Sequence, residues 1–236
     1  MKKISVIILS VVVVAFSSCE KVNGDGPVVT ETRNIVNYSG IDLRVSADVY
    51  FKQDPNFKVE ISAQRNILEV METYVSDNKL VIKYKNNVRV HSHDPVIIMV
   101  SGPTADHLRI SGSGNISVTG ILSPSRLEMD ISGSGNILIP QVATGYIDAD
   151  ISGSGNITIN TGTATDEQLK ISGSGTIDLL NVAANKASTN TSGSGDTKVN
   201  LSQNLDVKIS GSGSVYYKGS PIINASVSGS GKVIHI

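Results

Sequence analysis

The chain has 236 residues, a formal net charge of −1, 4% aromatic residues and a single cysteine. This length suits one elongated domain, the balanced charge argues against a nucleic-acid partner, and a single cysteine excludes an intrachain disulfide. No catalytic signature occurs anywhere in the sequence, so we expect a protein that is not an enzyme and needs no cofactor.

Residues 1–18 have the pattern of a signal peptide. Two lysines precede an apolar stretch, residues 4–16, that is too short to span a membrane comfortably as a permanent helix. Small residues then lead to Cys19, an arrangement that resembles a bacterial lipobox, although Phe16 stands where leucine is commoner. An ordinary signal peptide followed by an incidental cysteine is the alternative.

The lipobox resemblance implies cleavage by signal peptidase II, a lipid on Cys19 and attachment to a membrane. It places the protein in the cell envelope, at the outer membrane or the cell surface. We expect residues 19–27 to form a lipid-anchored linker between the membrane and the folded domain.

Residues 28–106 have the pattern of an N-terminal β region that contains one short helix. Runs of alternating apolar and polar residues predict strands through most of this region. Residues 65–75 instead have helical spacing, and we expect this helix to cap one end of the fold. A turn is predicted at residues 76–79.

Residues 107–236 contain seven copies of Ser-Gly-Ser-Gly at intervals of 18 to 21 residues. A fixed period of this size indicates stacked structural repeats, each of which buries its apolar face against the next. Around each copy, aliphatic residues alternate with polar ones, which is typical of a strand with one buried face. The copies begin at Ser111, Ser132, Ser152, Ser172, Ser192, Ser210 and Ser228.

The two glycines of each copy fall in phase with the buried aliphatic residues, and the two serines fall out of phase with them. A corner at this point therefore sends no side chain inward, and glycine also permits the positive φ that a sharp bend often needs. We predict an all-β fold, a parallel β-helix or β-solenoid with rungs of 18–21 residues, continuous with residues 28–106.

Four acidic residues are the best local candidate for a ligand site. They stand two and four residues before consecutive copies of the repeat, so we expect them on neighbouring strands about 4.8 Å apart. Carboxylates at this range could bind Ca²⁺, which would relieve their mutual repulsion. We favour a second interpretation over calcium binding, in which the four residues form a charged face exposed to solvent. A third interpretation is a pair of catalytic carboxylates similar to that of glycosidases. The residues are Glu128, Asp130, Asp148 and Asp150.

Several segments of the chain carry a family resemblance. They are IDLRVS at 41–46, DVYFKQ at 48–53, KVEISA at 58–63, LVIK at 80–83, LRI at 108–110 and the SGSGNI that begins at 111, 132 and 152. These segments resemble the head domain of autotransporter adhesins, the GIN domain, which is common in lipoproteins of Bacteroidetes. The resemblance implies a right-handed parallel β-helix similar to pectin-lyase folds but without their catalytic residues, and a role in cell adhesion. It implies no functional residue, because the family has no settled ligand.

These patterns together predict a cell-envelope lipoprotein that acts as an adhesin or surface-binding scaffold, with a glycan or a surface protein as its partner. A polysaccharide-active enzyme similar to pectin lyases and a purely structural envelope protein are the alternatives. The final strand-like run, residues 232–236, is followed by no cap, and an open rung is usually covered. We therefore also expect the protein to form homo-oligomers.

Overall fold

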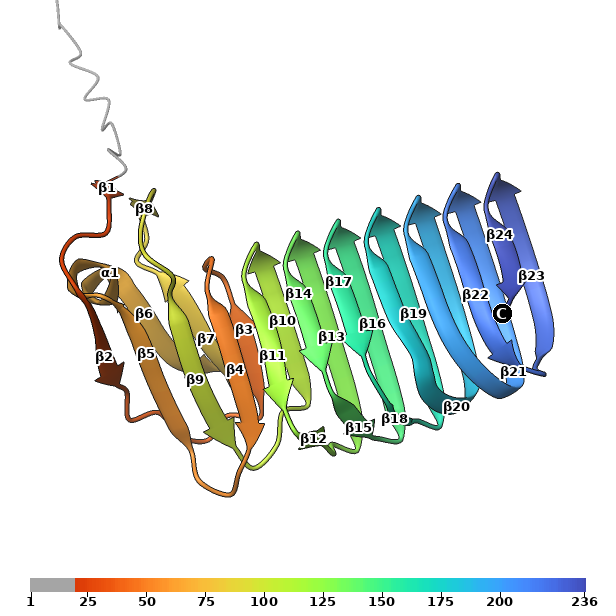
Figure 1. Ribbon diagram of the computed structural model, residues 1–236, viewed down its shortest axis with the longest axis horizontal. Helices are drawn as coiled ribbons and strands as arrows, with labels where there is room; N and C mark the ends of the chain where they lie inside the picture. The colour runs from red at the N-terminus through yellow and green to blue at the C-terminus, as the bar shows by residue number, and fades with distance from the viewer. Residues whose placement is uncertain (1–19) are drawn as a thin grey trace, which may run out of the picture.

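The computed structural model describes residues 20–236, so the predicted signal peptide and Cys19 lie outside the described residues. The strands coil into a solenoid of about six turns, which confirms the predicted fold class (Figure 1). Two long sheets enclose a narrow apolar core. Within residues 20–236 no helix has the length and apolar character needed to cross a membrane.

The first sheet contains the strands that lead into the glycine corners. Neighbouring strands run parallel, except that the outermost strand at the N-terminal end pairs antiparallel with the next one. In spatial order the strands are β6 (Met71–Ser76), β7 (Lys79–Tyr84), β3 (Gly40–Leu43), β10 (His107–Gly112), β13 (Arg126–Gly133), β16 (Tyr146–Gly153), β19 (Asp166–Gly173), the later parts of β20 (Thr176–Gly193) and β21 (Asp196–Gly211), and β23 (Ile222–Gly229).

The second sheet contains the strands that leave the glycine corners. In spatial order they are β2 (Val28–Thr32), β5 (Lys58–Gln64), β9 (Ile97–Gly102), β4 (Asp48–Gln53), β11 (Asn115–Thr119), β14 (Asn136–Ile139), β17 (Asn156–Ile159), the early parts of β20 and β21, β22 (Ser214–Gly219) and β24 (Lys232–His235). A short third side joins the two sheets at the looser turns. It consists of β12 (Ile121–Leu122), β15 (Gln141–Ala143), β18 (Gly162–Thr163) and the middle of β20.

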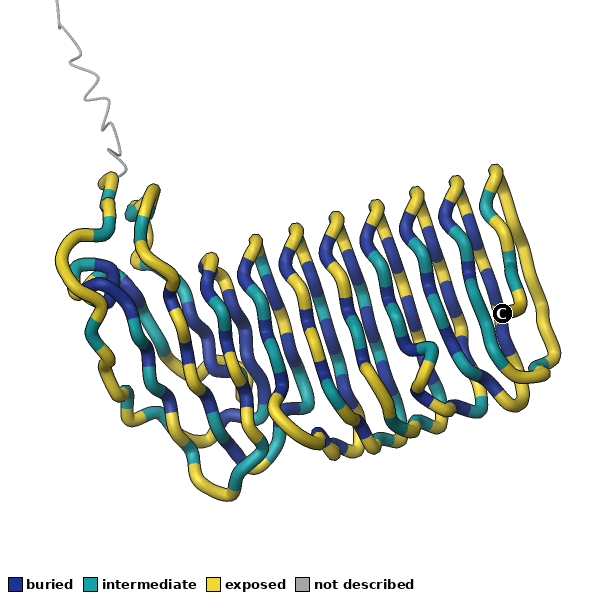
Figure 2. The backbone as a smooth tube through the Cα atoms, viewed as in Figure 1, coloured by how far each residue is buried: buried dark blue, intermediate teal, exposed yellow. Residues whose placement is uncertain are grey.

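Columns of aliphatic side chains fill the interior, and burial alternates along the strands as the sequence predicts (Figure 2). At all seven corners the first glycine has a positive φ, between 120° and 136°, a region that other residues avoid. The second glycine stacks against the corner of the preceding rung. A Cβ on Gly155 would lie 2.3 Å from the carbonyl oxygen of Gly135, so backbone conformation and stacking both require the motif.

The N-terminal end of the coil departs from the expected parallel arrangement. Strand β5 pairs antiparallel with both β2 and β9. Helix α1 (Arg65–Val70) follows β5 and buries Ile67 and Leu68 in the core. The antiparallel strands and the helix together close this end of the solenoid.

The helix predicted over residues 65–75 ends at Val70. The following residues include β-branched and aromatic side chains, which favour strands, and they pair as β6 with β7. The turn predicted at residues 76–79 closes this hairpin, with Asp77 and Asn78 at φ values of 49° and 59°. Pairing with a neighbouring strand thus overrides the helical spacing of the sequence.

The residues that follow Cys19 are hydrogen-bonded to the N-terminal end of the solenoid. Strand β1 (Glu20–Val22) pairs with β8 (Val88–Val90). The side-chain amide of Asn66 donates to the carbonyl oxygen of Asn23 at 2.6 Å and accepts from the amide of Asp25 at 3.1 Å. The segment expected to act as a linker therefore begins with a strand that is docked on the domain.

Candidate functional site

The outer face of the first sheet carries rows of polar and charged side chains, and we call it the charged face. Residues in register on neighbouring strands form the rows, which run along the solenoid axis. Four hollows of about 270 to 450 Å³ open onto this face. Two of the rows are Lys79, Gly40, His107, Glu128, Asp148 and Gln168, and Val81, Asp42, Arg109, Asp130, Asp150 and Lys170.

The four predicted acidic residues lie together near the middle of the charged face, on strands β13 and β16. The register aligns Glu128 with Asp148 and Asp130 with Asp150, the arrangement that their spacing from the repeats predicts. These residues define the acidic patch. Identical corners fix the register of both strands, and the register in turn brings the four carboxylates together.

Basic side chains on the same face neutralise much of the acidic patch. Arg126 bridges two rungs, with Nε 2.7 Å from Glu128 Oε1 and Nη2 2.7 Å from Asp148 Oδ2. Lys170 Nζ lies 2.8 Å from Asp150 Oδ2 on the next rung. Oppositely charged residues therefore alternate between neighbouring rungs on the side of Lys170.

His107 lies between two carboxylates of the acidic patch, with its side chain only 17% exposed. Its Nδ1 is 3.1 Å from Glu128 Oε2 and forms a hydrogen bond. Its Nε2 is 2.9 Å from Asp130 Oδ2, although the N–H direction does not meet hydrogen-bond geometry. The imidazole thus links β10 to both acidic residues of β13.

The four carboxylates are not electrostatically equivalent. The hydrogen bond from Arg126 lowers the pKa of Glu128, and the interaction with His107 lowers the pKa of Asp130. Burial raises the pKa of Asp148, and the neighbouring carboxylates of the patch add to this rise. Asp148 consequently takes up a proton before Asp130 does. The patch can accept hydrogen bonds from hydroxyl groups or attract a cation.

Calcium binding at the acidic patch stays a hypothesis beside the favoured interpretation of a solvated charged face. Among residues 20–236, no group of three or more His, Cys, Asp or Glu side chains is placed to hold a metal ion. Arg126 and Lys170 contact three of the four carboxylates instead. A bound Ca²⁺ would have to displace these ion pairs.

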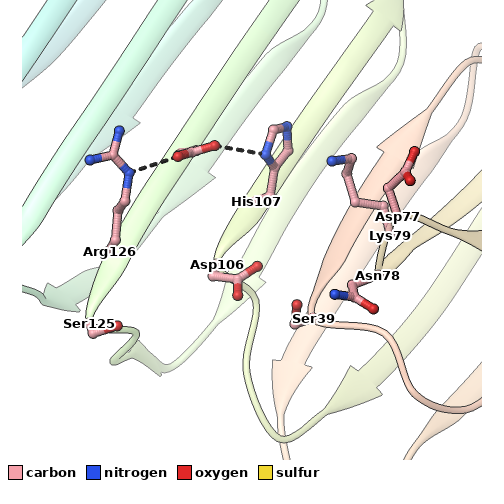
Figure 3. A pocket seen from close by; sticks show the side chains of 9 residues that line it. Ser39, Asp77, Asn78, Lys79, Asp106, His107, Ser125 and Arg126 are labelled. Carbon is pink, nitrogen blue, oxygen red and sulfur yellow. Dashed lines mark hydrogen bonds and ion pairs between the residues drawn. The ribbon is translucent and has the colours of Figure 1, made fainter.

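One of the four hollows lies where the front region meets the first repeat, and we call it the junction hollow (Figure 3). Lys79, His107 and Arg126 lie along one side of it in this view. Ser39, Asn78, Asp106 and Ser125 lie along the other. Asp77 and Glu128 complete the lining, and the volume is about 270 Å³.

Apart from Glu128, the residues of the junction hollow were not predicted as site residues from the sequence. They come from the chain before β3, the β6–β7 hairpin, the start of β10 and the start of β13. The repeat aligns β10 with β13, but no repeat indicates that Lys79 and His107 flank Gly40 on either side. The one sequence feature that pointed to part of this hollow was the predicted turn at residues 76–79, which contributes Asp77, Asn78 and Lys79 to the lining.

Comparison with known proteins gives a family match and several structural matches. A family model described as "Putative auto-transporter adhesin, head GIN domain" matches residues 37–221. No curated protein matches the chain.

Solved structures from Bacteroides and Parabacteroides species share the fold. A putative adhesin from Bacteroides fragilis is 24% identical, with a TM-score of 0.83, and the match covers 91% of this chain and 100% of the other. A putative lipid binding protein from Parabacteroides distasonis is 26% identical, with a TM-score of 0.78 and coverage of 92% and 100%. A putative adhesin from the same species is 22% identical, with a TM-score of 0.75 and the same coverage.

Proposed function

Because the chain belongs to the family of putative auto-transporter adhesins with a head GIN domain, we propose that it is an envelope adhesin that binds glycans through the charged face. The observation that carries this proposal is that four hollows open onto one face of one sheet. A row of separate polar depressions suits an extended hydroxyl-rich polymer.

The chemistry of the hollows favours a hydrophilic ligand. Side-chain hydroxyl, amide, carboxylate and ammonium groups line them, and these groups can donate to and accept from sugar hydroxyls. The backbone behind them is a continuous parallel sheet, so the polar groups are held in fixed register. This preorganisation reduces the entropy lost on binding. A lipid ligand, suggested by the name of one structural relative, would need an apolar cleft.

The glycan proposal is tested by incubating the chain with an array of host and bacterial glycans, with and without calcium. Binding that requires calcium and is lost in an Asp148→Asn/Asp150→Asn double variant would support both the glycan and the calcium at the acidic patch. Calcium-independent binding would support the glycan alone. A blank array would contradict the proposal in favour of a protein partner or a purely structural role, and release of reducing sugars would favour the enzyme alternative.

We further propose that Cys19 carries a lipid and holds the protein at the outer membrane or the cell surface. The lipobox-like sequence supports this proposal, and the docking of Glu20–Val22 would keep the anchored domain close to the membrane. Mass spectrometry of the mature protein and detergent phase partition test it. The native chain should enter the detergent phase and a Cys19→Ala variant should not. Equal partition of both would contradict a lipid at this position.

Homo-oligomer formation also stays a proposal. Every residue of β23 is exposed, and the strand contains no charged side chain that would discourage edge pairing. Sedimentation over a range of protein concentrations tests it, and a monomer at every concentration would contradict it.

A further inference from the structure

We propose that the junction hollow binds a single hexuronic acid unit of a glycan, with Lys79 contacting the sugar carboxylate and Asp106 accepting hydrogen bonds from its hydroxyls. This inference rests on the proposed glycan-binding function and names the class of sugar.

A buried glycine lies between the strands that carry Lys79 and His107. Gly40 stands between Lys79 and His107 in one row of the charged face. A Cβ at this position would lie 3.0 Å from Lys79 Cγ and 3.1 Å from His107 Cβ. The absence of a side chain therefore lets the ammonium and imidazole groups converge over β3, as Figure 3 shows.

Backbone hydrogen bonds hold the other side of the hollow in place. The amides of Ser39 and Gly40 both donate to the carbonyl oxygen of Asn78, at 2.8 and 3.2 Å. The amide of Asp106 donates to the carbonyl oxygen of Ser39 at 2.7 Å. Three segments far apart in the sequence are thus tied together beneath the hollow, and their side chains need little ordering when a ligand binds.

Three charged groups that line the hollow form no ion pair within residues 20–236, namely Asp77, Lys79 and Asp106. Of these, Asp77 accepts a hydrogen bond from Ser76 Oγ at 3.4 Å. In contrast, Arg126 and His107 contact Glu128. Lys79 is therefore available to an external anion, and Asp106 is available to external hydroxyl donors.

The positions of these two groups match a hexuronic acid. Lys79 lies on one side of the hollow, and Asp106 lies on the other with Ser39 and Asn78 (Figure 3). A hexuronic acid carries its carboxylate on one part of the ring and vicinal hydroxyls on another. The volume of about 270 Å³ is slightly below the usual range of ligand pockets, roughly 300–1,000 Å³, so it suits one sugar unit.

The test compares glucuronic acid-containing oligosaccharides with their methyl esters, which keep the hydroxyls and lose the charge. Titration calorimetry on the full chain should show that the acid binds about tenfold more tightly than the ester. Lys79→Gln should abolish this preference. Asp106→Asn should weaken binding of the acid and the ester alike.

Lys208→Gln is the matched control, because Lys208 also lies on the charged face, lines another hollow and forms no ion pair within residues 20–236. This variant should keep the preference for the acid. Equal binding of acid and ester by the native chain, or a preference that survives Lys79→Gln, would overturn the inference while leaving glycan binding intact. If no neutral or acidic glycan binds at all, the proposed function fails as well.

Discussion

The side-chain amide of Asn136 donates a hydrogen bond to Asn115 Oδ1 at 2.9 Å, from one rung of the solenoid to the next. Asn156 donates in the same way to Asn136 Oδ1 at 2.8 Å, and Asn115 donates to Asp48 Oδ1 at 2.8 Å. The asparagine that follows the first three glycine corners is therefore part of a continuous amide ladder. The ladder ends on a carboxylate of the front region and joins that region to the repeats.

Replacing Asn136 with alanine should destabilise the protein more than replacing Asn156, because the first change removes two ladder bonds and the second removes one. A net hydrogen bond contributes about 0.5–1.5 kcal/mol, and these exposed amides belong at the low end. We expect a loss of about 1 kcal/mol for Asn136→Ala and about half of that for Asn156→Ala, measured by urea unfolding. Equal losses would show that the ladder does not act as a connected unit.

Gly155→Ala should disrupt the stacking of the corners. The new Cβ would lie 2.3 Å from Gly135 O and 2.7 Å from Ile131 Cγ2, and the backbone oxygen cannot move without shifting the neighbouring rung. Overpacking of this kind costs about 1–3 kcal/mol or more. Ser154→Ala at the same corner is the control and should leave the melting temperature unchanged, since Ser154 is exposed. A stable Gly155→Ala variant would refute this account of the second glycine.

Arg33 should be essential for the N-terminal end of the solenoid. Its Nη1 donates to the carbonyl oxygen of Met71 at 2.8 Å and its Nη2 to that of Leu68 at 3.0 Å. Arg33→Ala leaves both acceptors without this donor, at a cost of about 1–3 kcal/mol for each one that stays buried. Hydrogen exchange should speed up in residues 65–76 and not in the repeats. Arg89→Ala, at an exposed position, is the control, and unchanged exchange in Arg33→Ala would contradict the role.

Glu167 should make stability depend on pH. Its side chain points into the core between the positions of Ile147 and Ala187, is 3% exposed, and leaves both carboxylate oxygens without a hydrogen-bond partner. Burial raises its pKa well above the usual range. The folded state therefore retains a proton that the unfolded chain releases above about pH 4.3.

The contribution of Glu167 to the free energy of unfolding should consequently be highest below about pH 4.3 and should fall as the pH rises from there toward the raised pKa of the folded state. Glu167→Leu should be more stable than the native protein at pH 7, with a difference that shrinks toward pH 4. Thermal melts of both proteins from pH 4 to pH 8 measure this difference. A difference that is independent of pH would show that the carboxyl group is not held in its neutral form.

The repeated half of the fold could be predicted because identical corners fix the register. Once the two glycines of each copy are aligned, Glu128 must lie beside Asp148, and the outward rows follow. The front region has no repeat, so its antiparallel pairs and the early end of α1 depend on contacts between distant segments. The same is true of the junction hollow, where Lys79 and His107 meet only because β3 lies between their strands.

The most direct test of the central claim compares two matched variants in glycan binding. Asp150 on the charged face and Asp178 on the second sheet each pair with a lysine at 2.8 Å, and their side chains are 36% and 30% exposed. We predict that Asp150→Asn weakens binding of the glycans identified on the array, whereas Asp178→Asn binds them as the native chain does. Equal binding by the two variants would contradict the assignment of the charged face as the recognition surface.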